Sequence, residues 1–226
     1  ANQWEITTAN GLVCRSTYLI SAIGCISSAN IPSISGLEEF TGDWYHTGKW
    51  PHEDVSFKNK RVGQIGTGST GIQAAPVIAE TAGHLHVFQR TPNYSVPARN
   101  APLTKDFKEY VRDNYEEIKD LVQSTPNGHP FRISTSKVFD SNEDERKKVY
   151  EDAWEKGGLQ FRATYQDLTT DKKANDTAAD FLKSKIKSVV RDKKTAEALS
   201  DIDYPYAGKR PPIDTNYFET FNKENV

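Results

Sequence analysis

An α/β fold is predicted by two neighbouring patterns in the sequence. An apolar segment over residues 60–65 runs into a glycine-rich turn, and residues 72–80 then carry the spacing of a helix. A second apolar segment, residues 85–90, follows the helix and ends at a Thr-Pro pair, where proline has no N–H for a sheet. Strand, helix and strand together take about 30 residues, which is the length of a unit with two parallel strands.

The glycine-rich turn has the pattern G-x-G-x-x-G, formed by Gly66, Gly68 and Gly71. The first glycine permits a tight turn, the second lets a pyrophosphate approach the backbone, and the third lets the helix pack closely on the strand. A pyrophosphate at the helix N-terminus is favoured by free N–H groups and the helix dipole. The alternative is an ordinary glycine-rich turn, but the flanking strand and helix favour a Rossmann-like dinucleotide site. The residues of this segment predicted to bind the cofactor are Gly66, Thr67, Gly68, Ser69, Thr70, Gly71 and Gln73.

The end of the second strand predicts which dinucleotide binds. A site for NAD places Asp or Glu about 20 residues past the glycines, where the carboxylate binds the ribose 2′-OH. This chain has Gln89, Arg90 and Thr91 there instead. Because a guanidinium pairs with a 2′-phosphate and a threonine adds a hydrogen bond, we expect NADPH. The alternative is that Arg90 only ends the strand at the surface.

Composition argues against several other classes of protein. The 226 residues are enough for one large or two small domains, and 29 basic against 31 acidic residues give a net charge of −2. This balance indicates neither a nucleic acid nor a membrane surface as partner, and no apolar run reaches the ~20 residues that span a bilayer. No secretory signal opens the chain, so we expect a cytoplasmic protein in which Cys14 and Cys25 are small, reduced core residues. A disulfide is the alternative, and no metal site is predicted.

β-structure is predicted at the start of the chain. Residues 3–8 and 12–22 alternate apolar and polar side chains around an Asn-Gly pair, which signals a two-residue hairpin. Residues 18–24 form an apolar run typical of a buried strand, and a Ser/Pro-rich link over 26–36 marks a domain boundary. Since the chain has no methionine and begins within a strand pattern, we expect a piece of a longer polypeptide.

A helical block of about a hundred residues follows the second strand of the nucleotide unit. Helical spacing of apolar residues predicts one amphipathic helix over 103–122, a second over 141–158, a third over 178–190 and a short fourth over 195–199. From Tyr204 the chain is irregular again. We therefore expect the helical block to be inserted into the α/β domain.

The segment before the glycine-rich turn resembles a family fingerprint. Its typed positions are Phe40, Gly42, His46, Trp50 and Pro51. This spacing resembles F-x-G-x-x-x-H-x-x-x-W-P of type I Baeyer–Villiger monooxygenases, which are FAD- and NADPH-dependent class B flavoprotein monooxygenases. In that family the segment joins the FAD and NADPH domains, and the resemblance links His46 to domain movement more than to bond-making. A class B flavin monooxygenase that oxidises nitrogen or sulfur is the alternative, although those relatives usually lack the Trp-Pro ending.

The resemblance also assigns cofactor contacts. Residues 87–97 look like the NADPH-selecting segment of the family, which supports Arg90 and Thr91 as contacts to the 2′-phosphate. By the same match Lys209 contacts that phosphate as well. Arg210 is the implied catalytic residue, because it would lie beside the flavin and stabilise the negative charge of the peroxyflavin.

The function implied by the resemblance is conversion of a ketone to an ester or lactone, with O2 and NADPH, through a C4a-peroxyflavin. The expected domains are 1–36, part of an FAD-binding domain and β-rich; 37–54, the fingerprint linker; 55–99, the first part of the NADPH-binding Rossmann domain; 100–203, the helical insertion; and 204–226, the return to the NADPH-binding domain and a linker. The resemblance covers the middle of such an enzyme, and the glycine loop expected for FAD is not in this sequence. We therefore expect the chain alone to bind NADPH without monooxygenase turnover, as an isolated NADPH-binding module.

Overall fold

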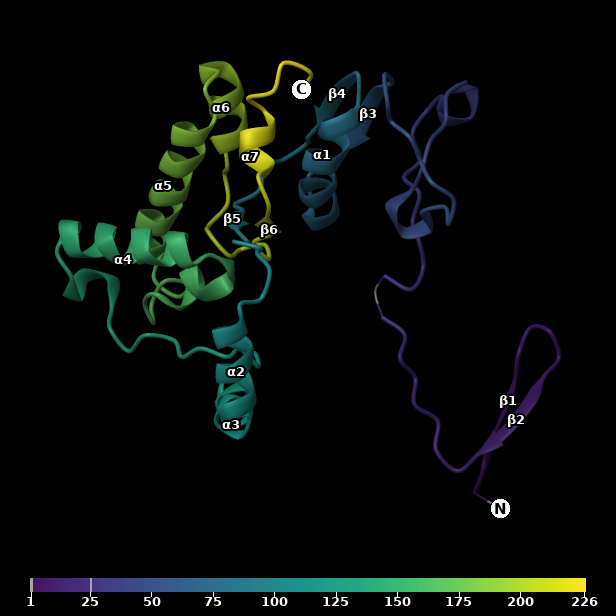
Figure 1. Ribbon diagram of the computed structural model, residues 1–226, viewed down its shortest axis with the longest axis horizontal. Coiled ribbons are helices and arrows are strands. Elements are labelled where there is room, and N and C mark those ends of the chain that lie inside the picture. Colours follow the sequence, from purple (N-terminus) through teal and green to yellow (C-terminus); the bar gives the residue numbers. More distant parts are fainter. Residues whose placement is uncertain (1, 25) are drawn as a thin grey trace. The chain divides into compact units, whose positions relative to one another are not determined.

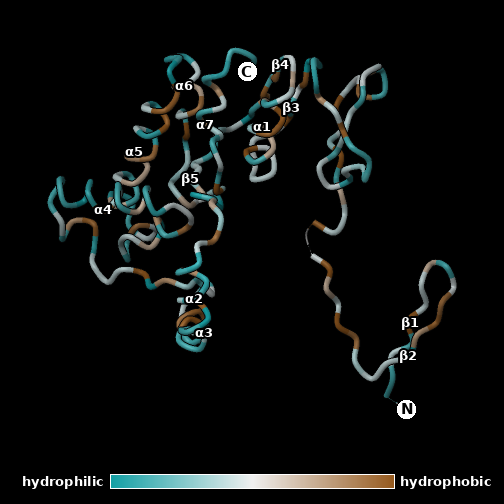
Figure 2. Tube along the Cα trace, viewed as in Figure 1, coloured by the Kyte–Doolittle hydropathy of each residue, from teal (hydrophilic) through white to brown (hydrophobic). Residues whose placement is uncertain are grey.

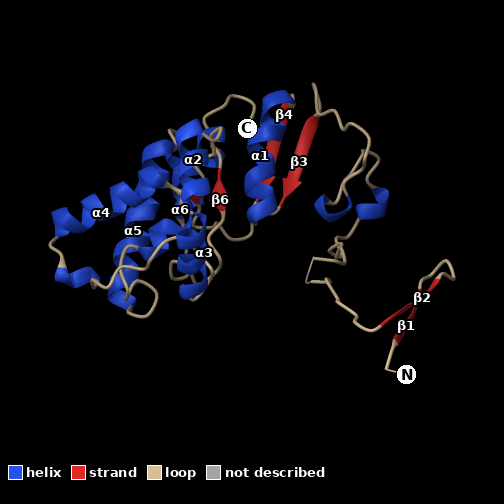
Figure 3. Ribbon diagram, turned by 60° about the horizontal axis from the view of Figure 1, so that its bottom comes forward, coloured by secondary structure: helices blue, strands red, loops and turns tan. Residues whose placement is uncertain are grey.

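The computed structural model describes residues 2–24 and 26–226 (Figure 1). The chain divides into two compact units, Ala1–Val55 and Ser56–Val226. The first is mostly irregular, whereas the second combines two short parallel strand pairs with helices. Figure 3 shows the helices of the second unit in blue, with β3 and β4 beside α1 in red.

A β-hairpin opens the first unit. Strands β1 (Trp4–Thr7) and β2 (Val13–Ser16) pair antiparallel, with Trp4 opposite Ser16. The predicted two-residue turn is wrong, because the N–H of Gly11 donates to the carbonyl of Thr8 (2.9 Å) and Gly11 then takes φ 84°. The connection is thus a three-residue loop that ends on a left-handed glycine. Cys14 is exposed in β2 rather than buried, and Cys25 lies outside the described residues.

The apolar run after β2 does not form the predicted buried strand. The strand ends at Ser16, and the side chains of Tyr18 and Ile20 are 81% and 88% exposed. The hydrophobic stretch is visible in Figure 2 as an unpaired segment of the tube. A buried strand needs hydrogen-bonding neighbours, and among the described residues of this unit only β1 and β2 pair. Two single turns of 3₁₀-helix, η1 (Leu37–Glu39) and η2 (Thr47–Lys49), follow later in the unit.

The second unit begins with the strand–helix–strand arrangement expected from the sequence. Strands β3 (Arg61–Ile65) and β4 (His84–Phe88) pair in parallel, with Arg61 opposite His84 and Ile65 opposite Phe88. Helix α1 (Ser69–Thr81) connects them. Its buried residues Ile72, Ala75 and Ala79 belong to the same core as Leu85 of β4. Two of the three helix residues are alanines, which allow a close approach between helix and core.

The last residues of the chain return to α1 and β4. Strands β5 (Val96–Pro97) and β6 (Ile213–Asp214) pair in parallel, and helix α7 (Tyr217–Thr220) packs against α1. The N–H of Leu85 donates to the carbonyl of Asn225 (2.7 Å). The Asn225 amide donates to the carbonyls of Ala79 (3.1 Å) and Ala82 (2.9 Å), so it satisfies acceptors at the end of α1.

Five helices lie between β5 and β6, where the sequence predicted four. The helix predicted over 103–122 is two helices, α2 (Lys105–Asp113) and α3 (Tyr115–Ser124). The break falls at Asn114, whose backbone N–H and side-chain amide both donate to the carbonyl of Tyr110. A side chain that competes for a backbone carbonyl favours the end of a helix over its continuation.

The other helices begin and end at recognisable caps. Helix α4 (Glu143–Lys156) begins after Asn142, whose side chain accepts from the N–H of Glu145, and ends at Gly157 with φ 72°. Helix α5 (Lys172–Val189) begins six residues before the predicted 178, because Asp171 caps it through the N–H of Ala174 (2.8 Å). Helix α6 (Lys193–Ser200) completes the set, with 3₁₀ turns η3 (Val138–Asp140) and η4 (Gly158–Ala163) between the others.

A buried asparagine ties the helices to residues 204–226, the returning segment of the chain. Asn175 of α5 is 5% exposed, and its amide donates to the carbonyls of Leu168 and Tyr206, both at 2.9 Å. Its side-chain oxygen accepts from the N–H of Tyr206 (2.8 Å). The ring of Tyr206 packs edge-on against Phe161, with 5.5 Å between ring centroids. The helical block and the returning segment therefore share one core.

Candidate functional site

Each of the three glycines in the turn after β3 is favoured for a different structural reason. Gly66 has φ 104°, which favours glycine, and its N–H donates to the carbonyl of Phe88 (2.9 Å). Gly68 is the residue that caps the start of α1. A Cβ on Gly71 would lie 2.3 Å from the carbonyl oxygen of Gly66, so only glycine allows helix and turn to approach this closely.

The N-terminus of α1 is open to a ligand. A Cβ on Gly68 would meet no atom within 4 Å, and Gly68, Ser69 and Thr70 are exposed. In the part of the chain that the structure describes, no side chain caps this end and no acidic residue occupies the first turn of α1. The first N–H groups of a helix need acceptors, so this end is suited to an anion.

The segment after β4 lies beside the glycine turn. The Thr67 hydroxyl donates to the carbonyl of Thr91 (3.3 Å), and the amide of Asn93 donates to the carbonyl of Thr67 (2.5 Å). Arg90 is exposed and Thr91 is half-buried. Thus the structure brings Arg90 and Thr91 to the same edge of the β3–β4 pair as the glycines.

Lys209 approaches the same edge from the distant end of the chain. Its Nζ lies 4.2 Å from the centre of the Tyr204 ring, a cation–π contact. The Tyr204 hydroxyl donates to Oδ1 of Asn93 (2.7 Å) and lies 3.1 Å from the carbonyl of Pro92. Burial raises the pKa of Tyr204, so its hydroxyl keeps the proton that this hydrogen bond needs at neutral pH.

Two further predicted residues lie on the returning segment or touch it. Arg210 is exposed directly after Lys209. Gln73 of α1 donates through Nε2 to the carbonyl of Ile213 (3.2 Å). The structure therefore gives Gln73 a contact within the chain, between α1 and β6, which the sequence did not predict.

The fingerprint residues lie in the first unit and form local contacts. A Cβ on Gly42 would lie 2.7 Å from the ring of Phe40, so glycine at this position leaves room for the ring. Nδ1 of His46 accepts from the N–H of Gly48 (3.0 Å) and caps η2. The rings of Tyr45 and Trp50 lie 5.6 Å apart, and Pro51 is half-buried. In this unit the histidine thus has a local structural contact as the cap of η2.

Sequence reasoning missed three residues that support the site. Asn93 and Tyr204 link the glycine turn to Lys209, but they are separated by 111 positions. Asn93 lies within residues 87–97, the segment that resembles the NADPH-selecting segment, whereas Tyr204 belongs to no recognised motif. Gln64 of β3 lies next to the turn, where its amide donates to the carbonyls of Gly66 (3.2 Å) and Gly71 (3.0 Å). Its position two residues before Gly66 is the one signal that pointed to it.

A buried carboxyl group underlies the strand pair β5–β6. Asp214 is 5% exposed, and its side chain accepts from the hydroxyl of Ser95 and from the N–H of Tyr217 (3.1 Å). Burial raises the pKa of Asp214, and these two hydrogen bonds oppose the shift. The group therefore holds the returning chain in place below Lys209 and Arg210.

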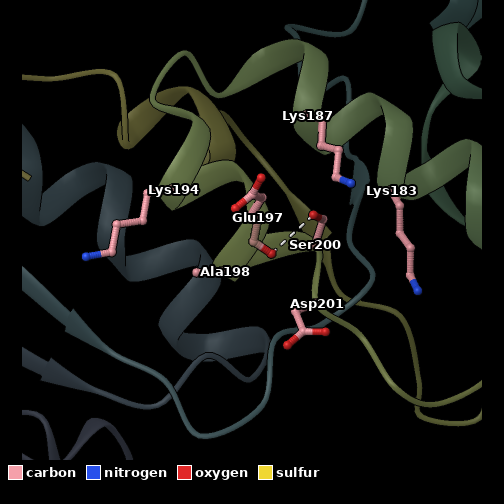
Figure 4. Close-up of a pocket in the computed structure, with 7 residues that line it drawn as sticks. All are labelled: Lys183, Lys187, Lys194, Glu197, Ala198, Ser200 and Asp201. Carbon is pink, nitrogen blue, oxygen red and sulfur yellow. Dashed lines mark hydrogen bonds between the residues drawn. The ribbon is translucent and has the colours of Figure 1, made fainter.

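A hollow on the second unit lies apart from the glycine turn. Figure 4 shows an open hollow of about 540 Å³ beside α5 and α6, where Lys194 points away from Lys183 and Lys187. None of the predicted site residues lines it. Among the described residues, no cluster of His, Cys, Asp or Glu is arranged to hold a metal ion. Within the same residues, no helix has both the length and the apolar character needed to cross a bilayer.

Comparison with known proteins shows which enzymes this chain is similar to. No protein-family model matches the chain. The cyclohexanone 1,2-monooxygenase of Acinetobacter sp. is 42% identical over 225 residues, which cover 99% of this chain and 41% of the relative. A Baeyer–Villiger monooxygenase of Pseudooceanicola batsensis is 41% identical over 226 residues, again 99% of this chain and 41% of the relative. The chain is a homologue of the Baeyer–Villiger monooxygenases.

Solved structures of Baeyer–Villiger monooxygenases share the fold of the chain. An oxidised steroid monooxygenase bound to NADP matches with a TM-score of 0.93 at 43% identity, over 99% of this chain and 43% of that protein. The cyclohexanone monooxygenase of Rhodococcus sp. Phi1 bound to NADP+ matches with a TM-score of 0.92 at 40% identity, over 100% of this chain and 42% of that protein. The resemblance predicted from the fingerprint is therefore confirmed.

A phenazine N-monooxygenase of Lysobacter antibioticus is also similar. It is 39% identical over 225 residues, which cover 99% of this chain and 41% of the relative. The chain thus spans about two fifths of the length of the curated relatives that it matches.

Proposed function

We propose that the chain is the NADPH-binding portion of a Baeyer–Villiger monooxygenase, which converts a ketone to an ester or lactone with O2. The observation that carries this proposal is the open N-terminus of α1 in the glycine-rich turn, which no side chain caps, with Arg90 and Lys209 at the same edge. Residues 55–99 and 204–226 are then a Rossmann-like domain, and residues 100–203 are its helical insertion. Similarity to structures that hold NADP supports this reading.

The residues present suit a dinucleotide phosphate. The exposed backbone at Gly68 gives a pyrophosphate access to the N–H groups of Ser69 and Thr70. The cations of Arg90 and Lys209 are assigned to the 2′-phosphate, where a guanidinium gives two parallel hydrogen bonds and an ammonium gives a point charge. Thr91 is assigned a further hydrogen bond to that phosphate.

FAD is the second cofactor of the proposed enzyme, and when bound it supplies the redox chemistry with O2. The role assigned to this chain is to hold the nicotinamide cofactor and to present Arg210. A guanidinium keeps its charge under all working conditions, so Arg210 stabilises negative charge that develops beside it during oxygenation. Arg210 is exposed on the returning segment, which leaves it free to face a cofactor.

Oxygenation of a nitrogen atom is the second candidate function. It is favoured by the 39% identity to a phenazine N-monooxygenase. The Trp50-Pro51 ending of the fingerprint favours ketone oxidation instead. Supplying the full-length protein with a cyclic ketone and with a phenazine, and identifying the oxygenated product by mass spectrometry, distinguishes the two.

Titration with NADP+ and NAD+ tests the proposed binding role. The chain is expected to bind NADP+ at least about tenfold more tightly, because hydrogen bonds to a charged group contribute about 1.5–3 kcal/mol. Arg90→Ala is expected to remove this hydrogen-bond contribution from NADP+ binding and to change the NAD+ affinity by less than about twofold. Arg112→Ala on the exposed surface of α2 is the matched control, which leaves both affinities unchanged. Equal affinities of the wild-type chain for the two dinucleotides would refute the proposal.

A further inference from the structure

Tyr204 occupies a position between two parts of the proposed site. One face of its ring receives the ammonium group of Lys209, at 4.2 Å from the ring centre. Its hydroxyl donates to Oδ1 of Asn93 (2.7 Å), and the amide of Asn93 donates in turn to the carbonyl of Thr67 in the glycine turn. A continuous set of contacts therefore joins the turn to a lysine more than a hundred residues away.

We propose that Tyr204 is a positioning residue that sets the preference for NADPH over NADH by holding the Lys209 ammonium at the edge of the glycine turn. This inference rests on the proposed function, because it assigns to Lys209 the 2′-phosphate of the dinucleotide. Tyr204 itself is given no contact to the cofactor. It acts through Lys209 alone.

The need for such a residue follows from the nature of lysine. Its four-carbon side chain has many rotamers, and an exposed lysine loses this freedom when it binds a phosphate. Lys209 is exposed, so few other packing contacts restrain it. A ring that already attracts the ammonium removes part of that entropic cost in advance. Since the ring covers one side of the ammonium, the other N–H groups remain available to phosphate oxygens.

The ring of Tyr204 is itself held in place. It packs edge-on against Tyr94, with 5.5 Å between the ring centroids, and Tyr94 is 2% exposed. The hydroxyl is fixed at the other end by Asn93 and lies close to the carbonyl of Pro92. The aromatic surface that meets Lys209 is thus oriented by a buried ring and by the glycine turn together.

A double-mutant cycle with dinucleotide titration tests the inference. Tyr204→Leu is expected to raise the Kd for NADP+ about two- to fivefold, the share of an exposed cation–π contact, and to leave the Kd for NAD+ within about 1.5-fold. In a Lys209→Ala background the same change is expected to have no further effect on NADP+ binding, because the residue through which Tyr204 acts is gone. If Tyr204 had a purely structural role, Tyr204→Leu would instead weaken the binding of both NADP+ and NAD+. It would do so in the wild-type and in the Lys209→Ala background alike.

The outcomes of the titrations distinguish a failure of the inference from a failure of the proposed function. An equal loss of NADP+ and NAD+ affinity, or an undiminished effect in the Lys209→Ala background, overturns the inference while the proposed function stands. A wild-type chain without preference for NADP+ overturns the proposed function itself. If Tyr204→Leu does not fold, Tyr204→Phe takes its place: it keeps the ring and loses the hydrogen bond to Asn93, and about a twofold loss for NADP+ that vanishes without Lys209 is expected.

Discussion

Replacement of Gly71 by alanine tests the geometry of the glycine turn most directly. The new Cβ would lie 2.3 Å from the carbonyl oxygen of Gly66, about 1 Å inside van der Waals contact. That carbonyl cannot move away freely, because it accepts from the amide of Gln64 (3.2 Å). Either α1 or the turn must therefore shift.

The expected magnitude is a balance of two effects. Forcing extra atoms into a packed contact costs about 1–3 kcal/mol, and a contact this short with a backbone oxygen belongs in the upper part of that range, about 2–3 kcal/mol. Replacing a helical glycine by alanine returns about 1 kcal/mol. We expect Gly71→Ala to lower the free energy of unfolding by about 1–2 kcal/mol, and to weaken NADP+ binding at least about tenfold because the turn is displaced.

Two other glycines provide the controls. A Cβ on Gly63 in β3 would lie 3.4 Å from the ring of Phe88, an ordinary contact, so Gly63→Ala is expected to leave stability unchanged or raise it by up to about 1 kcal/mol. A Cβ on Gly68 would meet no atom, so Gly68→Ala is expected to cost only about 0.5 kcal/mol as a changed cap, yet to obstruct the pyrophosphate. Urea denaturation measures the stability of each variant, and NADP+ titration measures its affinity for the dinucleotide. A Gly71→Ala chain as stable as the wild type would refute the close-approach argument.

Three further substitutions have defined outcomes. Asn175→Ala leaves two carbonyl groups and the buried N–H of Tyr206 without their partner, so we expect urea denaturation to show a loss of about 2–4 kcal/mol. Asn225→Ala removes two hydrogen bonds from the end of α1 and is expected to cost about 1–2 kcal/mol by the same assay, with no change in the NADP+ to NAD+ preference. Burial raises the pKa of Asp214 above 3.8, so the folded state favours its protonated form. Stability from this group is present below that pH and is lost as the pH rises through the raised pKa, so the stability of the wild type relative to Asp214→Asn should fall as the pH is raised above 3.8 and then level off once the pH has passed the raised pKa. A pH-independent difference between those two chains would contradict the assignment.

The sequence predicted those parts of the chain whose structure is decided locally. Glycines at 66, 68 and 71 between an apolar strand and a helix specify the turn, and Gly157 specifies the end of α4. The resemblance to Baeyer–Villiger monooxygenases, too, could be recognised from five residues at fixed spacing between Phe40 and Pro51, and the comparisons confirm this similarity.

The failures concern features that depend on distant or competing groups. The apolar run after β2 carries the pattern of a buried strand, but pattern alone does not supply the hydrogen-bonding neighbours. Asn114 ends α2 by a side-chain hydrogen bond that hydrophobic spacing does not register. The contacts of Tyr204 to Asn93 and Lys209 arise only after the chain has folded back on itself, so no local signal marks them.

The pairing of β5 with β6 sets the order in which the chain can fold. Ser95 and its hydrogen-bond partner Asp214 are 119 residues apart, and closing a flexible loop of that length costs about 4 kcal/mol of chain entropy. The helices between them rest largely on local contacts, so they are expected to form first and to shorten the distance that must be closed. The two-residue ladder then forms late. Lys209 would accordingly reach its place beside the glycine turn only in chains whose helical block is already complete.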